Sequence, residues 1–252
     1  MSLDLNTLLQ DWPHETGSIK VRKIVGLDGR EKLQLRIDLG LLQMEVQGRP
    51  DGQRPHNCES LLIYHQRRAA RSQARGDAYE LNPDQCNELQ QEGIQYYHRY
   101  LSLFQINDFP GVIRDTQRNL DLFSFVASHV DRDDLIWSFQ QFRPYVAMMN
   151  TRAKASILLS DGKFGEAMRE IEKGRDAIQE FFQQSPFPEL ASKSSELSFL
   201  EEWLEEVSSK RPLSKLEIMQ REMEVAIASE SYERAAELRD AIKLLKTPDA
   251  AV

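Results

Sequence analysis

The sequence predicts an α+β protein that is mainly helical, and three observations lead to this prediction. Apolar and polar side chains alternate over parts of residues 18–46, as in half-buried strands. From residue 82 onward, apolar side chains recur every three or four positions, as along amphipathic helices. A polar segment at 208–212 then precedes a last pair of such stretches. The predicted organisation is a small N-terminal β/α unit over 1–80, a repeat-like helical-hairpin body over 81–210 with an acidic last helix, and a C-terminal helical hairpin with a tail over 211–252.

The N-terminal strands are predicted because apolar residues recur at every second position. Residues 18–25 and 32–38 alternate around the turn-forming sequence Gly26-Leu-Asp-Gly-Arg30, so the pattern predicts a β-hairpin. Residues 39–46 fit a third strand after a bend at Gly40, although a helix fits so short a run as well. Four basic side chains are expected to share the solvent face of the hairpin: Lys20, Arg22, Lys32 and Arg36. A charged outer face is ordinary for such a sheet, and a ligand surface is the second interpretation.

A dense turn segment over residues 48–56 leads into an amphipathic helix expected at about 59–75. Backbone N–H groups at a helix start attract anions, and Arg49, Arg54 and His56 are close enough in sequence to clamp a phosphate or carboxylate there. The simpler interpretation is a rigid connection whose arginines pair with neighbouring carboxylates or lie in water.

Long helices are expected beyond residue 82, where Asn82-Pro-Asp-Gln85 combines a capping Asn, a Pro at the first helical position and a Gln at the third. The predicted helices span 84–106, 110–129, 132–160, 164–183 and 193–208. The loops before Phe109 and Phe164 are alike, and the second resembles a tetratricopeptide turn through Gly162, Phe164 and Ala167. Because 164 minus 109 is 55 residues, and a regular tetratricopeptide array repeats at roughly 34, only repeat-like hairpins are predicted.

The second interpretation of this helical region is a plain bundle, in which the aromatic side chains belong to the core. The side chains concerned are Trp137, Phe142, Tyr145, Phe181 and Phe182.

Chemistry-bearing clusters are sparse. Cys58 and Cys86 are isolated, the histidines are scattered, and no Gly-rich phosphate-binding sequence is present. The carboxylates at Asp131–Asp134 come directly before an apolar run and fit helix capping better than acid/base catalysis. We therefore predict no catalytic residue, no metal site and no cofactor, and expect the protein not to be an enzyme.

The last forty residues contain two amphipathic stretches. The first places Leu216, Met219, Met223 and Ala226 on one face, and Ser214 with Glu217 forms a capping box at its start. The second stretch has its own apolar positions at helical spacing: Ala235, Leu238, Ile242 and Leu245. A helical hairpin of this length has too little interior to be stable alone, since unassisted folding needs about 40 residues or more. It is expected to dock on its own chain or on a partner.

Residues 211–246 resemble the UVR motif, the helical hairpin near the C-termini of UvrB and UvrC and of some chaperone and kinase-activator proteins. The resemblance rests on Leu216-Glu-Ile-Met-Gln-Arg-Glu-Met223 and on Ser231-Tyr-Glu-Arg-Ala-Ala-Glu-Leu-Arg-Asp-Ala-Ile-Lys243. It implies a docking role, with another UVR-bearing protein or a second copy as partner. By resemblance, Tyr232 takes the place of an inserted aromatic residue, and the contact residues are Tyr232, Glu233, Ala235, Ala236, Leu238 and Arg239.

Charge is unevenly distributed in a chain whose net charge is −8. Residues 18–75 hold 12 Lys/Arg and 6 Asp/Glu, a balance of +6, whereas residues 76–252 hold 20 and 31, a balance of −11. The hairpin at 211–246 has seven of each sign, so it offers no basic surface for phosphate backbones. Nucleic acid is therefore a possible partner of the N-terminal region only.

The sequence thus favours a protein-protein interaction or adaptor function through the C-terminal hairpin. The alternatives are a DNA-repair accessory that contacts nucleic acid through the basic N-terminal region, and an anion-binding enzyme or sensor that uses residues 48–56. No basic region followed by an apolar stretch opens the sequence and no run reaches the roughly 18 apolar residues of a membrane span. We accordingly expect a cytoplasmic protein without a membrane partner.

Overall fold

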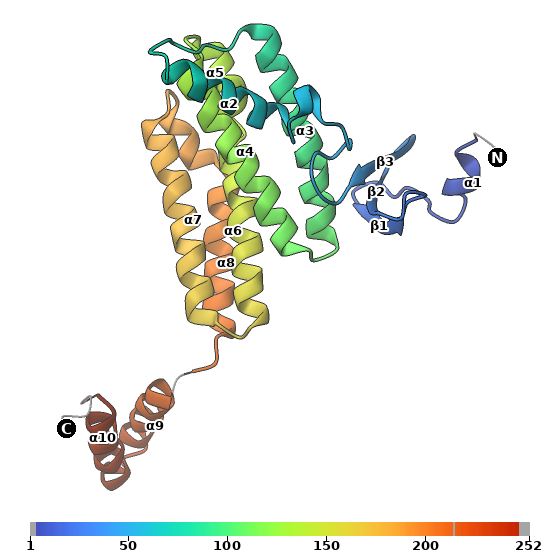
Figure 1. The fold of residues 1–252 in the computed structure, drawn as a ribbon. Helices are drawn as coiled ribbons and strands as arrows, with labels where there is room; N and C mark the ends of the chain where they lie inside the picture. Colours follow the sequence, from blue (N-terminus) through green and yellow to red (C-terminus); the bar gives the residue numbers. More distant parts are fainter. Residues whose placement is uncertain (1–3, 214, 247–252) are drawn as a thin grey trace, which may run out of the picture. The chain divides into compact units, whose positions relative to one another are not determined.

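The computed structural model describes residues 4–213 and 215–246 (Figure 1). The chain forms two compact units, Met1–Glu205 and Glu206–Val252. Most of the described residues are helical, and the strands that the structure describes form one small antiparallel sheet. This agrees with the predicted α+β class. Over the described ranges, every helix is too short or too polar to cross a membrane.

The N-terminal strands form the predicted hairpin and its extension. They are β1 (Lys20–Val25), β2 (Glu31–Ile37) and β3 (Gly40–Glu45), in the order β1-β2-β3, after a short helix α1 (Asn6–Leu9). The register pairs Lys20 with Arg36 and Lys32 with Glu45, which confirms a third strand after Gly40. On one face, Leu33, Leu35 and Met44 are buried, and β1 and β2 contact helix α3.

The other face of the sheet carries the four basic residues, as the register requires, but it is not an open solvent face as predicted. The Arg22 guanidinium lies 4.2 Å from the centre of the Trp12 ring, and Arg36 Nε donates to the Trp12 carbonyl at 2.9 Å. Lys20 Nζ donates to the Pro13 carbonyl at 3.0 Å, and Lys32 pairs with Asp28 and Glu45. The chain before β1 therefore lies over this face, and carboxylates neutralise much of its charge.

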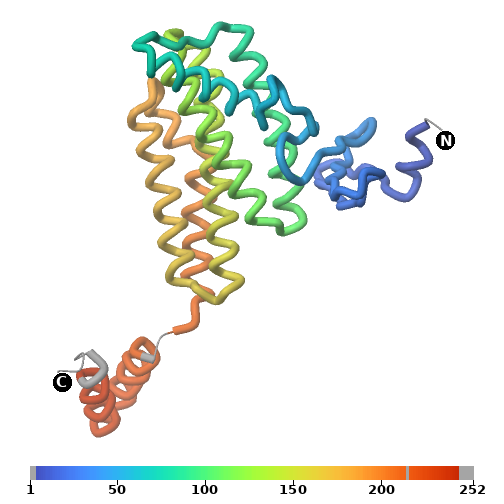
Figure 2. The backbone as a smooth tube through the Cα atoms, viewed as in Figure 1, coloured from blue at the N-terminus to red at the C-terminus, as the bar shows by residue number. Residues whose placement is uncertain are grey.

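Most helices of the first unit begin and end close to the predicted residues. After a short 3₁₀ turn η1 (Pro55–Asn57), the chain forms α2 (Leu61–Gln73), α3 (Pro83–Gln105), α4 (Phe109–His129), α5 (Asp133–Gln140), α6 (Arg143–Ser160) and α7 (Phe164–Gln184). A 3₁₀ segment η2 (Pro188–Lys193) leads into α8 (Ser195–Lys210), within which the first unit ends. Figure 2 follows this path from the blue sheet to the orange α8. The predicted cap of α3 is confirmed, because Asn82 and Gln85 form both hydrogen bonds of a capping box.

One predicted helix is wrong. The sequence predicts a continuous helix over 132–160, whereas the structure has α5 and α6 with a break at Gln141 and Phe142. The cause is Pro144, which lacks an N–H group and whose ring collides with the carbonyl group four residues earlier. That residue is Gln140, where α5 ends.

Neighbouring helices of the first unit pack in the series α3 with α4, α4 with α6 and α6 with α7. A core cluster includes Leu89 of α3, Leu122 and Phe123 of α4, Phe139 of α5 and Val146 of α6. The interpretation that the helical aromatics are core holds only in part. Phe182 is buried, Trp137, Tyr145 and Phe181 are half-buried, and Phe142 is 49% exposed because it lies in the break between α5 and α6.

The sheet and the helices belong to one unit, although the sequence predicts a boundary near residue 80. Two arginines hold them together. Arg99 of α3 donates to the carbonyl groups of Glu45 and Gly48, and Arg114 of α4 donates to the carbonyl group of Val46. These hydrogen bonds link residues more than fifty positions apart, which no local pattern reveals.

The same turn closes three antiparallel helix pairs. Asn107 after α3, Gly162 after α6 and Glu230 after α9 (Lys215–Ala228) have φ of 59°, 73° and 60°. At the second turn, Lys163 N–H donates to the Leu158 carbonyl at 2.8 Å and Gly162 N–H to the Leu159 carbonyl at 3.0 Å. The other two turns have the corresponding bonds, so all three are Schellman motifs.

An aromatic and a small residue follow at fixed positions in each of these turns. The aromatic residue lies two positions after the left-handed one, at Phe109, Phe164 and Tyr232, and begins the next helix. Three positions further on, a small side chain is buried, at Val112, Ala167 and Ala235. The tetratricopeptide-like feature predicted around Phe164 is thus a turn used three times, and not a regular repeat.

Candidate protein-interaction site

The second unit contains the helical hairpin predicted at 211–246, made of α9 and α10 (Tyr232–Lys246). Its interior is one narrow stripe in which Ala226 of α9 meets Ala235, Leu238 and Ile242 of α10, all of them buried. Small side chains at Ala226 and Ala235 permit the close approach of the two helices. The predicted capping residue Ser214 lies outside the described residues, as does the side chain of Leu245.

The structure divides the six predicted contact residues into two groups. Ala235 and Leu238 lie in the stripe between the two helices, so they hold the hairpin together. The remaining four are exposed or half-buried: Tyr232, Glu233, Ala236 and Arg239. At about 100° per residue, Tyr232, Ala236 and Arg239 form one flank of α10 beside the inner stripe. Of the predicted set, these three side chains share one surface outside the stripe between the helices.

The opposite flank of the hairpin is hollowed. The hollow measures about 650 Å³ and is open to solvent along one side. Its apolar lining comes from Leu213, Ile218, Val225, Ala226 and Leu238. Val225 is 63% exposed, and Leu213 and Ile218 are also among the exposed large apolar residues. Exposed apolar groups that line a concavity with a polar edge are typical of protein-binding surfaces.

Charged groups of both signs surround this hollow. Arg221 and Glu222 border it on α9, and Arg234 borders it on α10. Arg234 lies 3.8 Å from Glu222 and 3.0 Å from Glu237, so it bridges the two helices. An apolar floor with an edge of mixed charge suits another amphipathic helix better than a polyanion.

Sequence reasoning missed this hollow because it followed only the inward stripe of each helix. Leu213, Ile218 and Val225 are spaced by five and seven residues, off the positions that face α10. The sequence feature that indicates the hollow is that α9 has apolar residues on two sides. A helix whose apolar surface is wider than one partner requires has surface left for a second one.

The three predicted anion-binding residues do not form the predicted clamp around one point. Arg49 Nε lies 3.1 Å from Glu92, and its guanidinium lies 3.4 Å from Asp51. His56 stacks on Tyr64 with ring centres 4.0 Å apart, and Arg54 is exposed. The three side chains do not converge on one point through any recorded contact, and Arg49 is already paired with protein carboxylates.

The start of α2, where the anion was expected, holds a carboxylate of the protein itself. Glu92 of α3 is fully buried and accepts hydrogen bonds from the backbone N–H groups of Leu61 at 2.7 Å and Leu62 at 3.2 Å. It also pairs with Arg118 of α4. A negative charge at this helix start is favourable for the reason that motivated the prediction, namely the free N–H groups and the helix dipole. The geometry therefore gives the anion-binding hypothesis no support.

Among the described residues, no three His, Cys, Asp or Glu side chains come together as a metal-binding group. Cys58 and Cys86 are both buried as free thiols, and burial raises the pKa of the Cys86 thiol. Asp133 and Asp134 lie in the first turn of α5, and Asp134 pairs with Arg132, which agrees with their interpretation as helix-start carboxylates.

Residues 214–247 match the family described as the UvrB/uvrC motif, UVR. The match spans α9 and α10 and confirms the resemblance found at residues 211–246. It does not extend over the sheet or the helices of the first unit. Comparison with curated proteins and with solved structures gives no match.

Proposed function

We propose that this protein is a non-catalytic adaptor that binds a protein partner through the α9–α10 hairpin. The partner is either another protein with such a hairpin or a second copy of this chain. The observation that carries the proposal is the hollow between α9 and α10, whose floor and edges include the exposed apolar residues Leu213, Ile218 and Val225.

The three related turns support the same proposal. Phe109 packs against Phe104 with ring centres 5.6 Å apart, and Phe164 is half-buried, so the first unit itself shields these two aromatics. Tyr232 holds the corresponding position in the hairpin but is 67% exposed. The hairpin therefore presents an aromatic side chain that its structural equivalents cover, which is consistent with a surface that a partner covers.

The N-terminal basic region gives less support to the nucleic-acid alternative. Lys20 lies within reach of Glu15, Lys32 contacts Asp28 and Glu45, and Arg22 lies against Trp12. A nucleic acid would have to displace these carboxylates to recover the charge that drives phosphate binding. For that reason we do not extend the proposal to DNA or RNA.

A matched pair of variants tests the proposal in the full chain. The double substitution Ile218→Glu with Val225→Glu places two charges in the hollow, whereas Leu27→Glu with Leu39→Glu adds the same charge at two exposed apolar positions in the turns between the strands of the sheet. Each protein is immobilised and used to capture partners from a lysate of its source cells, with quantification by mass spectrometry. Sedimentation equilibrium separately measures association between copies.

We expect the hairpin double variant to capture at least tenfold less partner, or to self-associate at least tenfold more weakly, because a glutamate is costly to bury in an apolar contact. The sheet double variant is expected to behave like the wild-type protein. If the hairpin variant keeps both the same partners and the same sedimentation mass, docking through this hollow is wrong. Circular dichroism of both variants shows whether the helices remain folded.

A further inference from the structure

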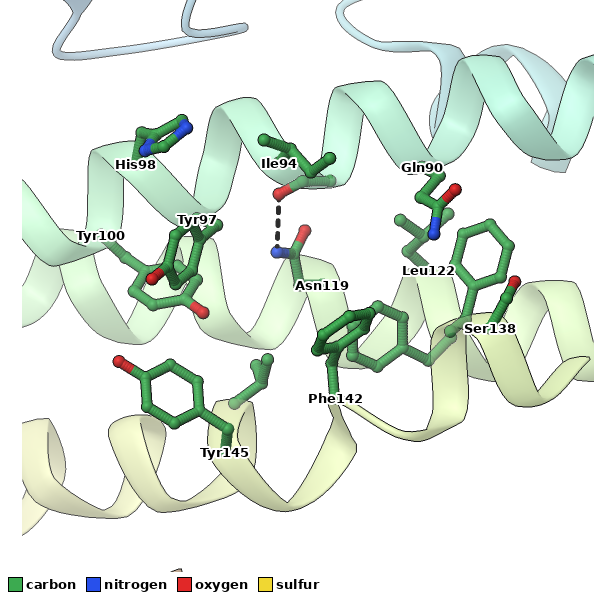
Figure 3. A pocket seen from close by; sticks show the side chains of 14 residues that line it. Gln90, Ile94, Tyr97, His98, Tyr100, Asn119, Leu122, Ser138, Phe142 and Tyr145 are labelled. Carbon is green, nitrogen blue, oxygen red and sulfur yellow. Dashed lines mark hydrogen bonds between the residues drawn. The ribbon is translucent and has the colours of Figure 1, made fainter.

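A second concave surface lies in the first unit, between helices α3 and α6. Both helices pack on α4, which forms the floor of a cleft of about 470 Å³, and α5 contributes part of its wall (Figure 3). This volume is within the roughly 300–1,000 Å³ of small-molecule sites. Leu122, Phe139 and Val146 line its interior and are almost fully buried, whereas Ile94, Tyr97 and Phe142 are partly exposed at its mouth.

The lining of this cleft is aromatic and carries no formal charge. Phe123, Phe139, Phe142 and the tyrosines supply most of the aromatic surface. Asp, Glu, Lys and Arg are absent from the lining residues. His98 is the one lining residue that could become charged near neutral pH, and burial lowers the pKa of its imidazole, which keeps it neutral. A charged ligand would lose its hydration here without gaining an opposite charge.

Three phenol groups gather at one end of the cleft. Figure 3 shows Tyr97, Tyr100 and Tyr145 beside one another, with ring centres 5.5 Å apart for Tyr97 and Tyr100 and 6.3 Å apart for Tyr97 and Tyr145. Tyr100 is 1% exposed, and burial raises the pKa of its phenol group, which keeps the hydroxyl protonated and able to donate a hydrogen bond. A tyrosine hydroxyl that is removed from bulk water ordinarily takes a polar partner, and Tyr100 lines the cleft.

Other polar side chains of the cleft are paired within the protein. Asn119 Nδ2 donates to the Gly93 carbonyl at 3.1 Å, the bond drawn in Figure 3, and Asn119 Oδ1 accepts from Arg118 at 3.0 Å. Figure 3 shows Gln90 and Ser138 at the end of the cleft away from the tyrosines, and Ser138 Oγ donates to the Leu135 carbonyl at 2.7 Å. The three phenol groups are thus the largest group of polar side chains at one place in the lining.

From these observations we propose that the cleft binds an uncharged, largely aromatic small molecule. One hydrogen-bonding group of that molecule lies at the tyrosine end, within reach of Tyr100, and its rings lie between Tyr145 and the phenylalanines. This site is independent of the hairpin and of the docking function proposed for it.

Two fluorescent probes that differ by one charge test this inference. N-phenyl-1-naphthylamine is neutral, has two aromatic groups and carries one N–H donor, and 1-anilinonaphthalene-8-sulfonate has the same skeleton with a sulfonate. Titration of the full chain is expected to show saturable binding of the neutral probe at one site. We expect the sulfonate to bind at least tenfold more weakly, and equal affinity for the two probes would overturn the proposed ligand class.

Matched variants locate the probe. Phe142→Ala removes a half-exposed ring from the cleft, and Phe187→Ala removes one of similar exposure, 39%, outside it. We expect the first to weaken neutral-probe binding about tenfold and the second to change it less than twofold. Ile94→Ala, on the other side of the mouth, is a second variant for the same purpose. Thermal unfolding of each variant shows whether it is folded.

Two further variants address the hydrogen bond and the competing hollow. Tyr100→Phe keeps the ring and is expected to weaken the neutral probe roughly three- to tenfold, whereas the double variant Ile218→Glu with Val225→Glu is expected to leave binding unchanged. The proposal is overturned if binding survives Phe142→Ala and Ile94→Ala unaltered, or if the hairpin variant abolishes it. Unchanged affinity in Tyr100→Phe would remove the hydrogen bond from the proposal.

Discussion

Buried charges hold the first unit together. Arg99 is 1% exposed and forms a two-bond ion pair with the fully buried Asp115, at 2.6 and 2.7 Å. The guanidinium groups of Arg99 and Arg118 lie 4.9 and 4.2 Å from the centre of the Tyr96 ring. Burial lowers the pKa of Arg118 to about 9, which leaves it charged at neutral pH and able to pair with Glu92. Removing one member of such a network leaves an uncompensated charge in the interior.

Asp115→Asn is therefore expected to destabilise the first unit by about 3–5 kcal/mol. The same substitution at Asp134, whose pair with Arg132 is exposed, is expected to cost less than about 1 kcal/mol. Urea unfolding followed by circular dichroism measures both. Similar midpoints for the two variants would show that the buried network adds no more than a surface pair.

His65 gives the first unit a dependence on pH. It is 2% exposed, and its Nδ1 lies 2.6 Å from the Tyr79 hydroxyl. Burial, and to a smaller extent the nearby Arg68 and His56, lower the pKa of His65 to about 4. The folded state therefore keeps this imidazole neutral at pH values where the unfolded chain, with a pKa near 6.5, already binds a proton.

Stability should accordingly fall as the pH drops from about 6.5 to 4, because in this window the unfolded state binds more protons than the folded state. The loss attributable to His65 is on the order of 2–3 kcal/mol. His65→Gln is expected to flatten this dependence. Denaturation at a series of pH values provides the comparison, in which His98 contributes equally to both proteins, and parallel curves would contradict the role given to His65.

The charged residues of the core can be noticed in the sequence, but helical periodicity alone does not identify their partners. Leu89, Glu92, Tyr96, Arg99 and Leu103 are spaced as one face of α3, and all five are buried. Charged side chains at core positions of a helix indicate buried pairing, but their partners lie on other elements. The pairing of Glu92 with the start of α2 and of Arg99 with the chain after β3 therefore required the structure.

At the scale of the elements, the same type of turn occurs in the helical body and in the hairpin. Its left-handed residue is Gly162 after α6 but Glu230 after α9. A residue with a Cβ atom is strained by about 1–2 kcal/mol in this conformation, and glycine is not. The likeness of the turns before Phe109 and Phe164 is visible in the sequence through their aromatic residues. The third turn is not visible in this way, because glutamate gives no indication of a left-handed backbone.

Exchanging the left-handed residues should have opposite effects. Glu230→Gly is expected to stabilise the α9–α10 hairpin by about 0.5–1 kcal/mol, and Gly162→Ala is expected to destabilise the first unit by about 1 kcal/mol. Amide hydrogen exchange in the full chain reports on α9 and α10 separately from α6 and α7. Slower exchange in α6 and α7 after Gly162→Ala, or faster exchange in the hairpin after Glu230→Gly, would contradict the assignment of the turn.

At the scale of the molecule, the sequence predicted the class of fold and the two helices of the hairpin, because both follow from local periodicity. It placed a boundary near residue 80 and did not predict that the sheet and the helices form one unit, since the contacts that unite them are long-range. Likewise, the hollow on the hairpin and the cleft on α4 depend on which apolar residues remain uncovered after packing. The central claim concerns the first of these two surfaces, as the place where a partner protein docks.

Site-specific photo-crosslinking in the source cells tests that claim most directly. A photoreactive phenylalanine is introduced at Ile218 or Val225 in the hollow of the hairpin and, as controls, at Leu27 or Leu39 in the turns between the strands, all exposed apolar positions. The account predicts one discrete crosslinked protein from the hairpin positions and none shared with the controls. Crosslinks of equal yield and identity from all four positions, or none from the hairpin, would contradict docking through α9 and α10.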